Sequence, residues 1–312
     1  TDSYYPPELF KYNIDELTKA AVQMFDEKHS TSDFPEWITM LKNNLMRSKQ
    51  RILLISDIGF QIDHFRNLFE LHNCATFAEL TVHCSPNGEE ALAAQNPPVT
   101  ALNVKENAEA ILQSFDLIIS YHCRQLFPAE IVSKIRCVNI HPGFNPYNRG
   151  WYPGVYSIAN GLPAGATIHE IDEKIDNGPI IAQKQISILP EETSGGVYPK
   201  IIQAEYDLLQ EWFMPMITGD YQTFSPKERG NLNYKKDYYS FQQLDLEEKL
   251  TTKQVIDKLR ALTHPPFQNA YYVDQATGDR IYVSVELKRV KKNAWNLLLR
   301  NPFPFIEVFN YS

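Results

Sequence analysis

Residues 51–57 read RILLISD, an almost unbroken run of Ile and Leu. A strand that is apolar on both faces is typical of a parallel sheet, in which helices cover both sides. Four further apolar strand patterns follow, and helix patterns separate them. The strand patterns lie at 78–85, 96–104, 116–123 and 137–142, and the helix patterns at 62–71, 107–115 and 128–135. This alternation predicts an α/β fold with a Rossmann-like, doubly wound and mostly parallel sheet.

The chain is expected to have three parts. Residues 1–49 carry two amphipathic helix patterns and form a predicted N-terminal helical extension. Residues 50–220 form the main domain, which ends with two more strands around a loop at 172–178 and a long helix from about 196 to 217. Residues 221–312 form a small C-terminal α+β region with a helix and a β-hairpin.

Composition excludes several classes of protein. The chain has 312 residues, of which 43% are hydrophobic, as is typical of a globular protein. Its net charge of −8 is unfavourable for binding the phosphate backbone of a nucleic acid. No apolar run is long enough to cross a membrane, and no signal-peptide pattern opens the sequence, so we expect a cytoplasmic protein without membrane insertion. The four cysteines form no CxxC pair and are expected to be buried, reduced thiols.

Polar side chains interrupt the strand pattern in CVNIHPGFNPYNRGW, residues 137–151. Asn139 and His141 are two residues apart and therefore share one face of the strand. They stand at its carboxyl end, where doubly wound sheets bind ligands. Asp176 lies in IDNGP, a turn that can present a carboxylate. An amide, an imidazole and a carboxylate can together stabilise an oxyanion and move a proton.

Simpler interpretations compete with a catalytic one. A strand histidine and an Asn before a turn often only satisfy backbone groups. A metal site is the second alternative, because three histidines and two aspartates are available, but no HxH or HExxH spacing is present. The turn after the first strand, SDIGFQID, lacks the glycines of a nucleotide-binding loop. The potential metal ligands are His122, His141, His169, Asp172 and Asp176.

A resemblance narrows these alternatives. The segment NIHPGFNPYNRGW, with IDNGP about thirty-five residues after its Asn, resembles the catalytic segment of the 10-formyltetrahydrofolate-dependent formyltransferases. HPGFNPYNRGW and TIHEID are most similar to the branch that acts on nucleotide-linked amino sugars, and residues 259–272 are similar to the carboxyl-terminal segment of the family. The resemblance covers about residues 50–290, and residues 1–49 depart from the family pattern.

The resemblance implies the reaction. A formyl group would pass from 10-formyltetrahydrofolate to the amine of a dTDP-linked 3- or 4-amino-dideoxyhexose, for bacterial surface polysaccharide such as O-antigen. Asn139 and a protonated His141 would stabilise the tetrahedral oxyanion, and Asp176 would keep the ring charged and help to remove the amine proton. The resemblance also implies no metal and a homodimer.

Two sets of binding residues follow from the same resemblance. The folate would lie against the strand-end segment and the loop before Asp176, at Tyr121, Cys123, Arg124, Leu126, Asp172 and Ile175. The nucleotide sugar would need cations for its diphosphate and aromatic rings for its base. The residues implied for this are Arg149, Trp151, Asn233, Tyr234, Lys235 and Lys236. The alternative is that they form only a solvated surface.

Other functions stay open at this point. A formyltetrahydrofolate hydrolase could use the same three residues to deliver water, although it would need no acceptor site. A non-catalytic module that binds nucleotide sugars is a further alternative. Methionyl-tRNA as acceptor is disfavoured by the acidic composition, because tRNA binding requires a basic surface.

Overall fold

The computed structural model describes residues 49–292, and all of these except Lys49 belong to one compact unit that begins at Gln50. The predicted helical extension, residues 1–49, lies almost entirely outside the described residues. The boundary predicted near residue 220 stays a prediction.

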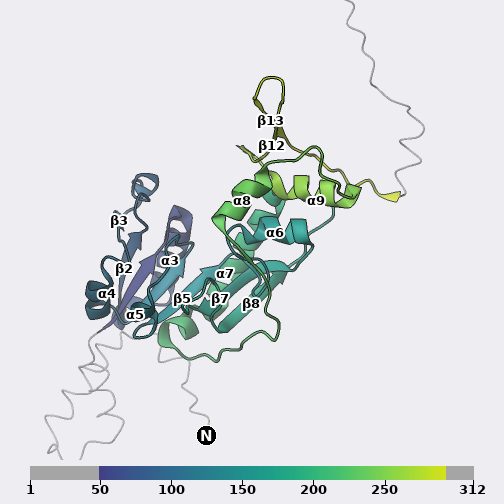
Figure 1. Ribbon diagram of the computed structural model, residues 1–312. Helices are drawn as coiled ribbons and strands as arrows, with labels where there is room; N and C mark the ends of the chain where they lie inside the picture. The colour runs from purple at the N-terminus through teal and green to yellow at the C-terminus, as the bar shows by residue number, and fades with distance from the viewer. Residues whose placement is uncertain (1–48, 293–312) are drawn as a thin grey trace, which may run out of the picture. The chain divides into compact units, whose positions relative to one another are not determined.

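A seven-stranded sheet forms the centre of this unit, with the order β3-β2-β1-β4-β5-β7-β8 (Figure 1). Five strands are parallel, and β7 and β8 run antiparallel at one edge. The strands are β1 (Gln50–Ile55), β2 (Ala78–Cys84), β3 (Thr100–Ala101), β4 (Leu117–Tyr121), β5 (Arg136–His141), β7 (Ala164–Glu170) and β8 (Ile180–Ile186). The mostly parallel sheet predicted from the sequence is confirmed.

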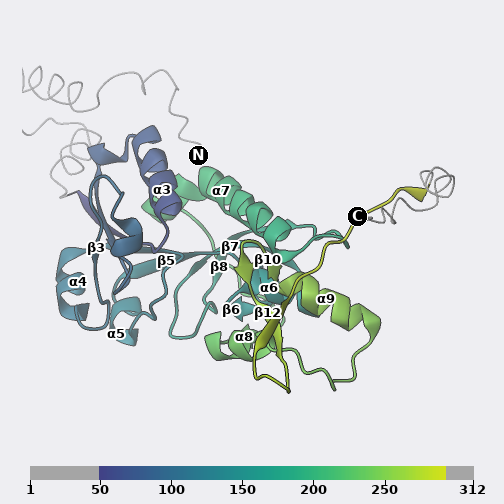
Figure 2. The ribbon, with the colours of Figure 1, turned by 90° about the horizontal axis from the view of Figure 1, so that it is seen from above.

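Helices cover both faces of the sheet, as Figure 2 shows: α3 (Gly59–Leu71) and α7 (Ser194–Thr218) lie on one side, and α4 (Ala108–Ser114) and α5 (Ala129–Val132) on the other. Each face has its own core, because alternate residues of β1, β4 and β5 point to opposite sides. Leu54 packs toward α3 and α7, whereas its neighbours Leu53 and Ile55 pack toward α4 and α5.

The long helix α7 carries the largest apolar stripe of the unit. Leu209, Phe213 and Met216 recur at helical spacing and are buried against the sheet, whereas Ile201 packs with residues of α6 and α9. The helix ends where Gly219 takes a left-handed φ of 82° and its N–H bonds to Pro215 O, a common C-terminal cap.

The remaining elements group together at the end of the unit away from β2 and β3 (Figure 1). Helices α6 and α9 contact each other and α7. The strands β12 and β13 form the predicted antiparallel hairpin, and β6 pairs with β9. The elements of this group are β6 (Arg149–Gly150), α6 (Pro153–Asn160), β9 (Leu232–Asn233), α8 (Lys235–Gln242), α9 (Thr252–Leu262), β10 (Thr263–His264), β11 (Phe267–Gln268), β12 (Ala270–Val273) and β13 (Arg280–Val283). Two short 3-10 turns, Cys74–Thr76 and Glu90–Leu92, lie instead near β2.

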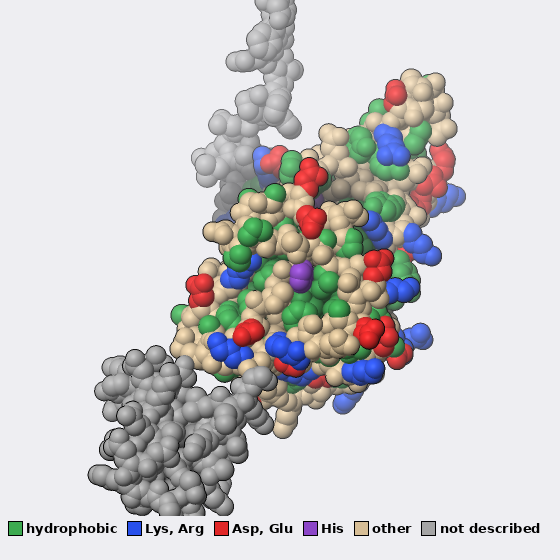
Figure 3. All heavy atoms as spheres, turned by 90° about the vertical axis from the view of Figure 1, so that its left-hand side faces the viewer, with side chains coloured by type: hydrophobic (Ala, Val, Ile, Leu, Met, Phe, Trp, Pro, Cys, Tyr) green, Lys and Arg blue, Asp and Glu red, His purple; other side chains and the backbone are tan. Residues whose placement is uncertain are grey.

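The charges on the surface and the state of the cysteines agree with the predictions from composition. On the face drawn in Figure 3, basic and acidic side chains are mixed. Within residues 49–292, no helix has the length and apolarity that a membrane crossing requires. The four cysteines are free, and Cys74, Cys84 and Cys137 are buried, as predicted, while Cys123 is half-buried.

Candidate active site

A cavity of about 840 Å³ opens at the carboxyl ends of β4 and β5. Its walls come from the segment after β4, the loop before Asp176, the start of α6, the first half of α7 and parts of the C-terminal group. A cavity of this size can hold the reacting ends of two molecules at once. Asn139, His141 and Asp176, the three predicted catalytic residues, all line it.

The end of β5 sets the position of His141. The residue pairs with Thr167 of β7, and Pro142 and Gly143 then turn the chain over the cavity. A Cβ atom on Gly143 would lie 2.4 Å from His141 Nε2. Glycine is therefore required at 143, because any larger residue would displace the imidazole.

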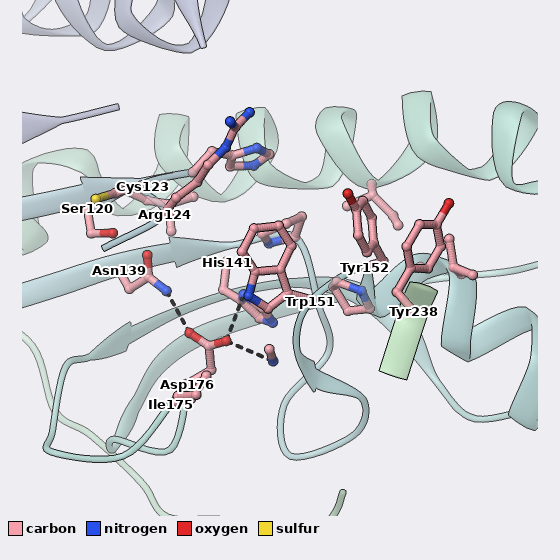
Figure 4. A pocket seen from close by; sticks show the side chains of 18 of the residues that line it. Ser120, Cys123, Arg124, Asn139, His141, Trp151, Tyr152, Ile175, Asp176 and Tyr238 are labelled. Atoms are coloured by element: carbon pink, nitrogen blue, oxygen red, sulfur yellow. Dashed lines mark hydrogen bonds and ion pairs between the residues drawn. The ribbon is translucent and has the colours of Figure 1, made fainter. Parts of the chain in front are cut away.

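Asp176 reaches the same point from a turn with a left-handed φ of 45°. Its Oδ1 accepts a hydrogen bond from Asn139 Nδ2 at 3.1 Å, and its Oδ2 accepts one from the Gly150 N–H at 2.9 Å (Figure 4). His141 Nδ1 lies 3.5 Å from Oδ2. The structure therefore brings the amide, the ring and the carboxylate together around one corner of the cavity.

Burial decides the charge of His141. The ring is enclosed, and burial lowers its pKa to about 4 although Asp176 opposes this shift. The ring of the ligand-free chain is therefore neutral at neutral pH, and a ring that becomes protonated during the reaction stays a prediction. Burial alone would raise the pKa of the Asp176 carboxyl, but the two histidines and the Gly150 N–H together lower it below its ordinary value. The pair thus holds a neutral imidazole against a carboxylate at neutral pH.

The tautomer of His141 follows from this arrangement. A carboxylate only accepts hydrogen bonds, so Nδ1, which faces Asp176, carries the proton of the neutral ring. Nε2 is then a lone-pair acceptor, and it is a buried atom without a hydrogen-bond partner among the residues that the structure describes. An unsatisfied buried acceptor in a cavity is a natural site for a substrate proton.

A second histidine, which the sequence reasoning considered only as a metal ligand, supports the group. His169 Nδ1 donates to Glu170 O at 2.7 Å, so its Nε2 is an acceptor, and Asn139 Nδ2 donates to it at 3.2 Å. Both amide hydrogens of Asn139 are therefore engaged, one with Asp176 and one with His169. The pairing of β5 with β7 places these residues opposite each other, a relation that sequence spacing does not reveal.

Most residues predicted to bind the folate lie on the cavity wall. Cys123, Arg124, Leu126, Asp172 and Ile175 line it. Tyr121 does not line it: its side chain is fully buried in the core beneath α7, because strand alternation turns residue 121 away from the crevice. The folate is predicted to lie against the backbone of residues 121–128, so a contact with the Tyr121 backbone stays a prediction.

The residues predicted to bind the nucleotide divide into two groups. Trp151 lines the cavity, and Lys235 Nζ lies 4.9 Å from the centre of its ring. Arg149 is buried outside the cavity and donates to Asn177 Oδ1 at 2.6 Å, so it braces the turn that carries Asp176 instead of offering a free cation. Asn233, Tyr234, Lys235 and Lys236 also lie outside the cavity lining, and Lys235 reaches it only through its contact with Trp151.

An aromatic rim, Trp151, Tyr152, Tyr238 and Tyr239, borders the cavity away from Asp176. Tyr152 and Tyr238 stack with ring centres 3.9 Å apart, and Figure 4 shows Tyr152 and Tyr238 on the side of His141 that faces away from Cys123. Only Trp151 was predicted. Tyr238 stands on α8, a helix whose sequence is too polar to reveal a buried face.

Comparison with protein families gives two matches. Residues 87–212 match the family described as "Formyl transferase", and residues 237–289 match the "N-formyltransferase dimerization C-terminal domain". The chain belongs to the formyltransferase family, as its sequence motif predicted.

Known relatives narrow the class to sugar N-formyltransferases. The chain is 44% identical, over 70% of its length and 90% of the relative, to a dTDP-4-amino-4,6-dideoxyglucose formyltransferase of Mycobacterium bovis. It is also similar to the solved structure of a sugar N-formyltransferase from Shewanella sp., with 35% identity, a TM-score of 0.74, and coverage of 78% of this chain and 99% of that one. A 4-N formyltransferase from Francisella tularensis gives 35% identity and a TM-score of 0.72, covering 77% and 99%.

Proposed function

We propose that this chain transfers a formyl group from 10-formyltetrahydrofolate to the C4 amine of a dTDP-linked 4-amino-4,6-dideoxyhexose. The observation that carries the proposal is the group formed by Asn139, His141 and Asp176, which lines the cavity and in which His141 Nε2 is a buried acceptor without a partner among the described residues. The choice of C4 over C3 rests on the named activities of the M. bovis and F. tularensis relatives.

His141 acts as the base. The neutral sugar amine forms a bond to the formyl carbon, and its nitrogen loses a proton to His141 Nε2. Asp176, held by Asn139 and Gly150, stabilises the imidazolium that results. The proton then passes from Nε2–H to the folate nitrogen as its bond to the formyl carbon breaks, which yields the formamide and tetrahydrofolate.

Two donors serve the oxyanion of the tetrahedral species. Once protonated, His141 offers Nε2–H to it. Asn139 can offer one amide hydrogen if it gives up its bond to His169, the longer of its two bonds, at 3.2 Å against 3.1 Å. One such donor contributes about 3 kcal/mol to stabilising a transition state.

The two substrates occupy opposite ends of the cavity in this proposal. The folate lies against Cys123, Arg124 and Leu126 on one side and Asp172 and Ile175 on the other, where irregular backbone can contact a pterin. The nucleotide lies against the aromatic rim, because stacked rings suit a thymine base. Lys235, held over Trp151, supplies a cation for the diphosphate.

The test is incubation with 10-formyltetrahydrofolate and a panel of dTDP-3-amino and dTDP-4-amino sugars, read by mass. The expected result is a gain of one formyl unit on a 4-amino sugar. Formate release without any sugar would favour a hydrolase. Binding of the nucleotide sugar without turnover would favour a non-catalytic module, and competition by bulk tRNA would favour a tRNA acceptor.

We also propose a homodimer formed through residues 237–289, which the matched family name supports. Within this segment, apolar side chains are exposed at Phe267 (66%) and Tyr282 (43%). Phe267 is on β11 and Tyr282 on β13, two neighbouring short hairpins, and exposed rings of this kind favour a protein interface. A cytoplasmic location and a role in bacterial surface polysaccharide stay predictions of the same proposal. Sedimentation of the chain and of a Tyr282→Glu variant tests the dimer.

A further inference from the structure

The turn that carries Asp176 is held by residues 145–150, which follow β5. Asp176 has a left-handed φ of 45°, which is uncommon for a residue with a side chain. Backbone in this region persists only where its surroundings fix it, often at functional sites. Asn145, Arg149 and Gly150 all contact this turn. Their contacts therefore fix a backbone conformation that an isolated turn would rarely adopt.

The side chain of Asn145 is directed at the Asp176 backbone. Asn145 Nδ2 donates to Asp176 O at 2.9 Å, and because a carbonyl oxygen only accepts, this contact fixes the orientation of the amide. The residue is 3% exposed, and its Oδ1 is buried without a hydrogen-bond partner in the described part of the chain. A buried, unpaired carbonyl costs free energy, so packing alone would favour an apolar residue at 145. The bond to Asp176 is the side-chain contact that offsets this cost.

Arg149 holds the residues on either side of Asp176. Its Nη1 donates to Asn177 Oδ1 at 2.6 Å and lies 3.4 Å from Ile175 O. The Gly150 N–H donates to Asp176 Oδ2 at 2.9 Å (Figure 4). Residues 145–150 thus contact three successive residues of the turn, and they reach both the backbone and the carboxylate of the middle one.

The position of the Asp176 carboxylate decides how well it supports His141. Asp176 Oδ2 lies 3.5 Å from His141 Nδ1, which is already longer than a hydrogen bond between charged groups. A further shift of the turn would weaken the stabilisation of the imidazolium. Asn145 and Arg149 do not line the cavity, so their contact with the reacting groups passes through this turn.

We propose that Asn145 and Arg149 are positioning residues that hold the Asp176 carboxylate against His141, and that they affect formyl transfer only through that carboxylate. The inference rests on the proposed function and deepens it. A displacement of about 1 Å in a catalytic group can slow a reaction by roughly 10²-fold. Because neither residue lines the cavity, their loss should lower the maximal rate and leave the half-saturating concentrations of both substrates unchanged.

A double-mutant cycle separates this role from a purely structural one. Asn145→Ala removes the bond to Asp176 O, and Asp176→Gly removes the carboxylate while accepting left-handed backbone. Gln183→Ala is the matched control, because Gln183 Nε2 donates to the backbone oxygen of the same Asn145 and to Thr167 Oγ1. The measured quantity is the single-turnover rate of formylation of a dTDP-4-amino sugar, at increasing concentrations of each substrate.

We expect Asn145→Ala to lower the maximal rate by about 10- to 100-fold in the wild-type chain, but by no more than about twofold in Asp176→Gly. A loss of folded protein would lower the rate by the same factor in both backgrounds. Equal factors would therefore overturn the inference. Gln183→Ala should lower the rate by no more than about threefold, and a loss as large as that of Asn145→Ala would also overturn it.

Arg149→Gln provides a second cycle with Asp176→Gly, which tests the inference even where Asn145→Ala does not fold. The same pattern is expected, with a large loss in the wild-type chain and almost none without the carboxylate. Equal losses in both backgrounds, or a changed half-saturating concentration with an unchanged maximal rate, would overturn the inference and leave the proposed function intact. A wild-type chain that binds the nucleotide sugars and formylates none of them would overturn the proposed function, and the inference with it.

Discussion

The two ends of the cavity are built differently. At the Asp176 end, Asn139, His141 and His169 reach the carboxylate from three directions and are held by hydrogen bonds or close ion-pair contacts. At the other end, the aromatic rim is held by ring contacts, and Tyr152 is 40% exposed. The first end is buried and, apart from His141 Nε2, its polar side-chain atoms contact one another, whereas the second is partly open to solvent.

This difference separates chemistry from recognition. Proton transfer requires a base whose position and charge are set before the substrate arrives, and a buried polar network supplies both. Ring stacking tolerates small shifts and requires mainly area, so a partly exposed rim is sufficient. Substitutions at the Asp176 end should therefore change kcat, and substitutions at the rim should change KM.

The largest effect is expected for His141→Gln. Removing the base should lower kcat by roughly 10²- to 10⁴-fold, because general-base catalysis contributes about that much. KM for the nucleotide sugar should change little. His264→Gln is the matched control, since His264 lines the cavity on the C-terminal side. A His141→Gln enzyme with near wild-type kcat in single-turnover formylation would show that this end is not the chemical one.

The next effect concerns stability against pH. Burial lowers the pKa of His141 to about 4 in the folded chain, from 6.5 for a histidine in water. Between these values the unfolded chain binds a proton that the folded chain does not, so the free energy of unfolding falls as the pH drops from about 6.5 to 4, by about 3 kcal/mol. Above pH 6.5 this contribution is constant.

Urea unfolding of wild type and His141→Gln at several pH values measures this contribution. The difference between the two curves should change by the stated amount across the window and be flat above it, because the other titrating groups are common to both proteins. Parallel curves would mean that the ring is not held neutral, and the contrast between the two ends of the cavity would lose its electrostatic basis.

Much of the fold could be predicted because the central strands are apolar on both faces. Strand β3 is shorter than the pattern at 96–104 indicated, since Pro97 and Pro98 cannot donate to a sheet. The antiparallel direction of β7 and β8 was not predictable, because a strand pattern contains no direction. Helix α8 was missed since only Tyr238 of its eight residues is buried.

The sequence predicted the candidate site only in part, as it did the fold. Asn139 and His141 could be predicted from their spacing at a strand end and Asp176 from its turn, and the family motif contains all three. The neutral charge of His141 and the bracing role of Arg149 could not be predicted, because both depend on burial that long-range packing creates. The contact between Asn145 and Asp176 joins residues 31 positions apart.

The smallest effects are expected at the rim. Trp151→Ala should raise KM for the nucleotide sugar by about tenfold and leave kcat within about threefold of wild type, since losing one stacked ring costs about 1 kcal/mol or slightly more.

Lys235→Ala should raise KM for the nucleotide sugar only about threefold. This smaller effect should fade with added salt, because the charge of Lys235 is exposed and screened. Steady-state kinetics at low and high ionic strength measure both. A fall in kcat with unchanged KM in Trp151→Ala would instead assign the rim to the chemistry. A ring that only binds the thymine of the nucleotide sugar would not lower the rate at which the bound complex reacts.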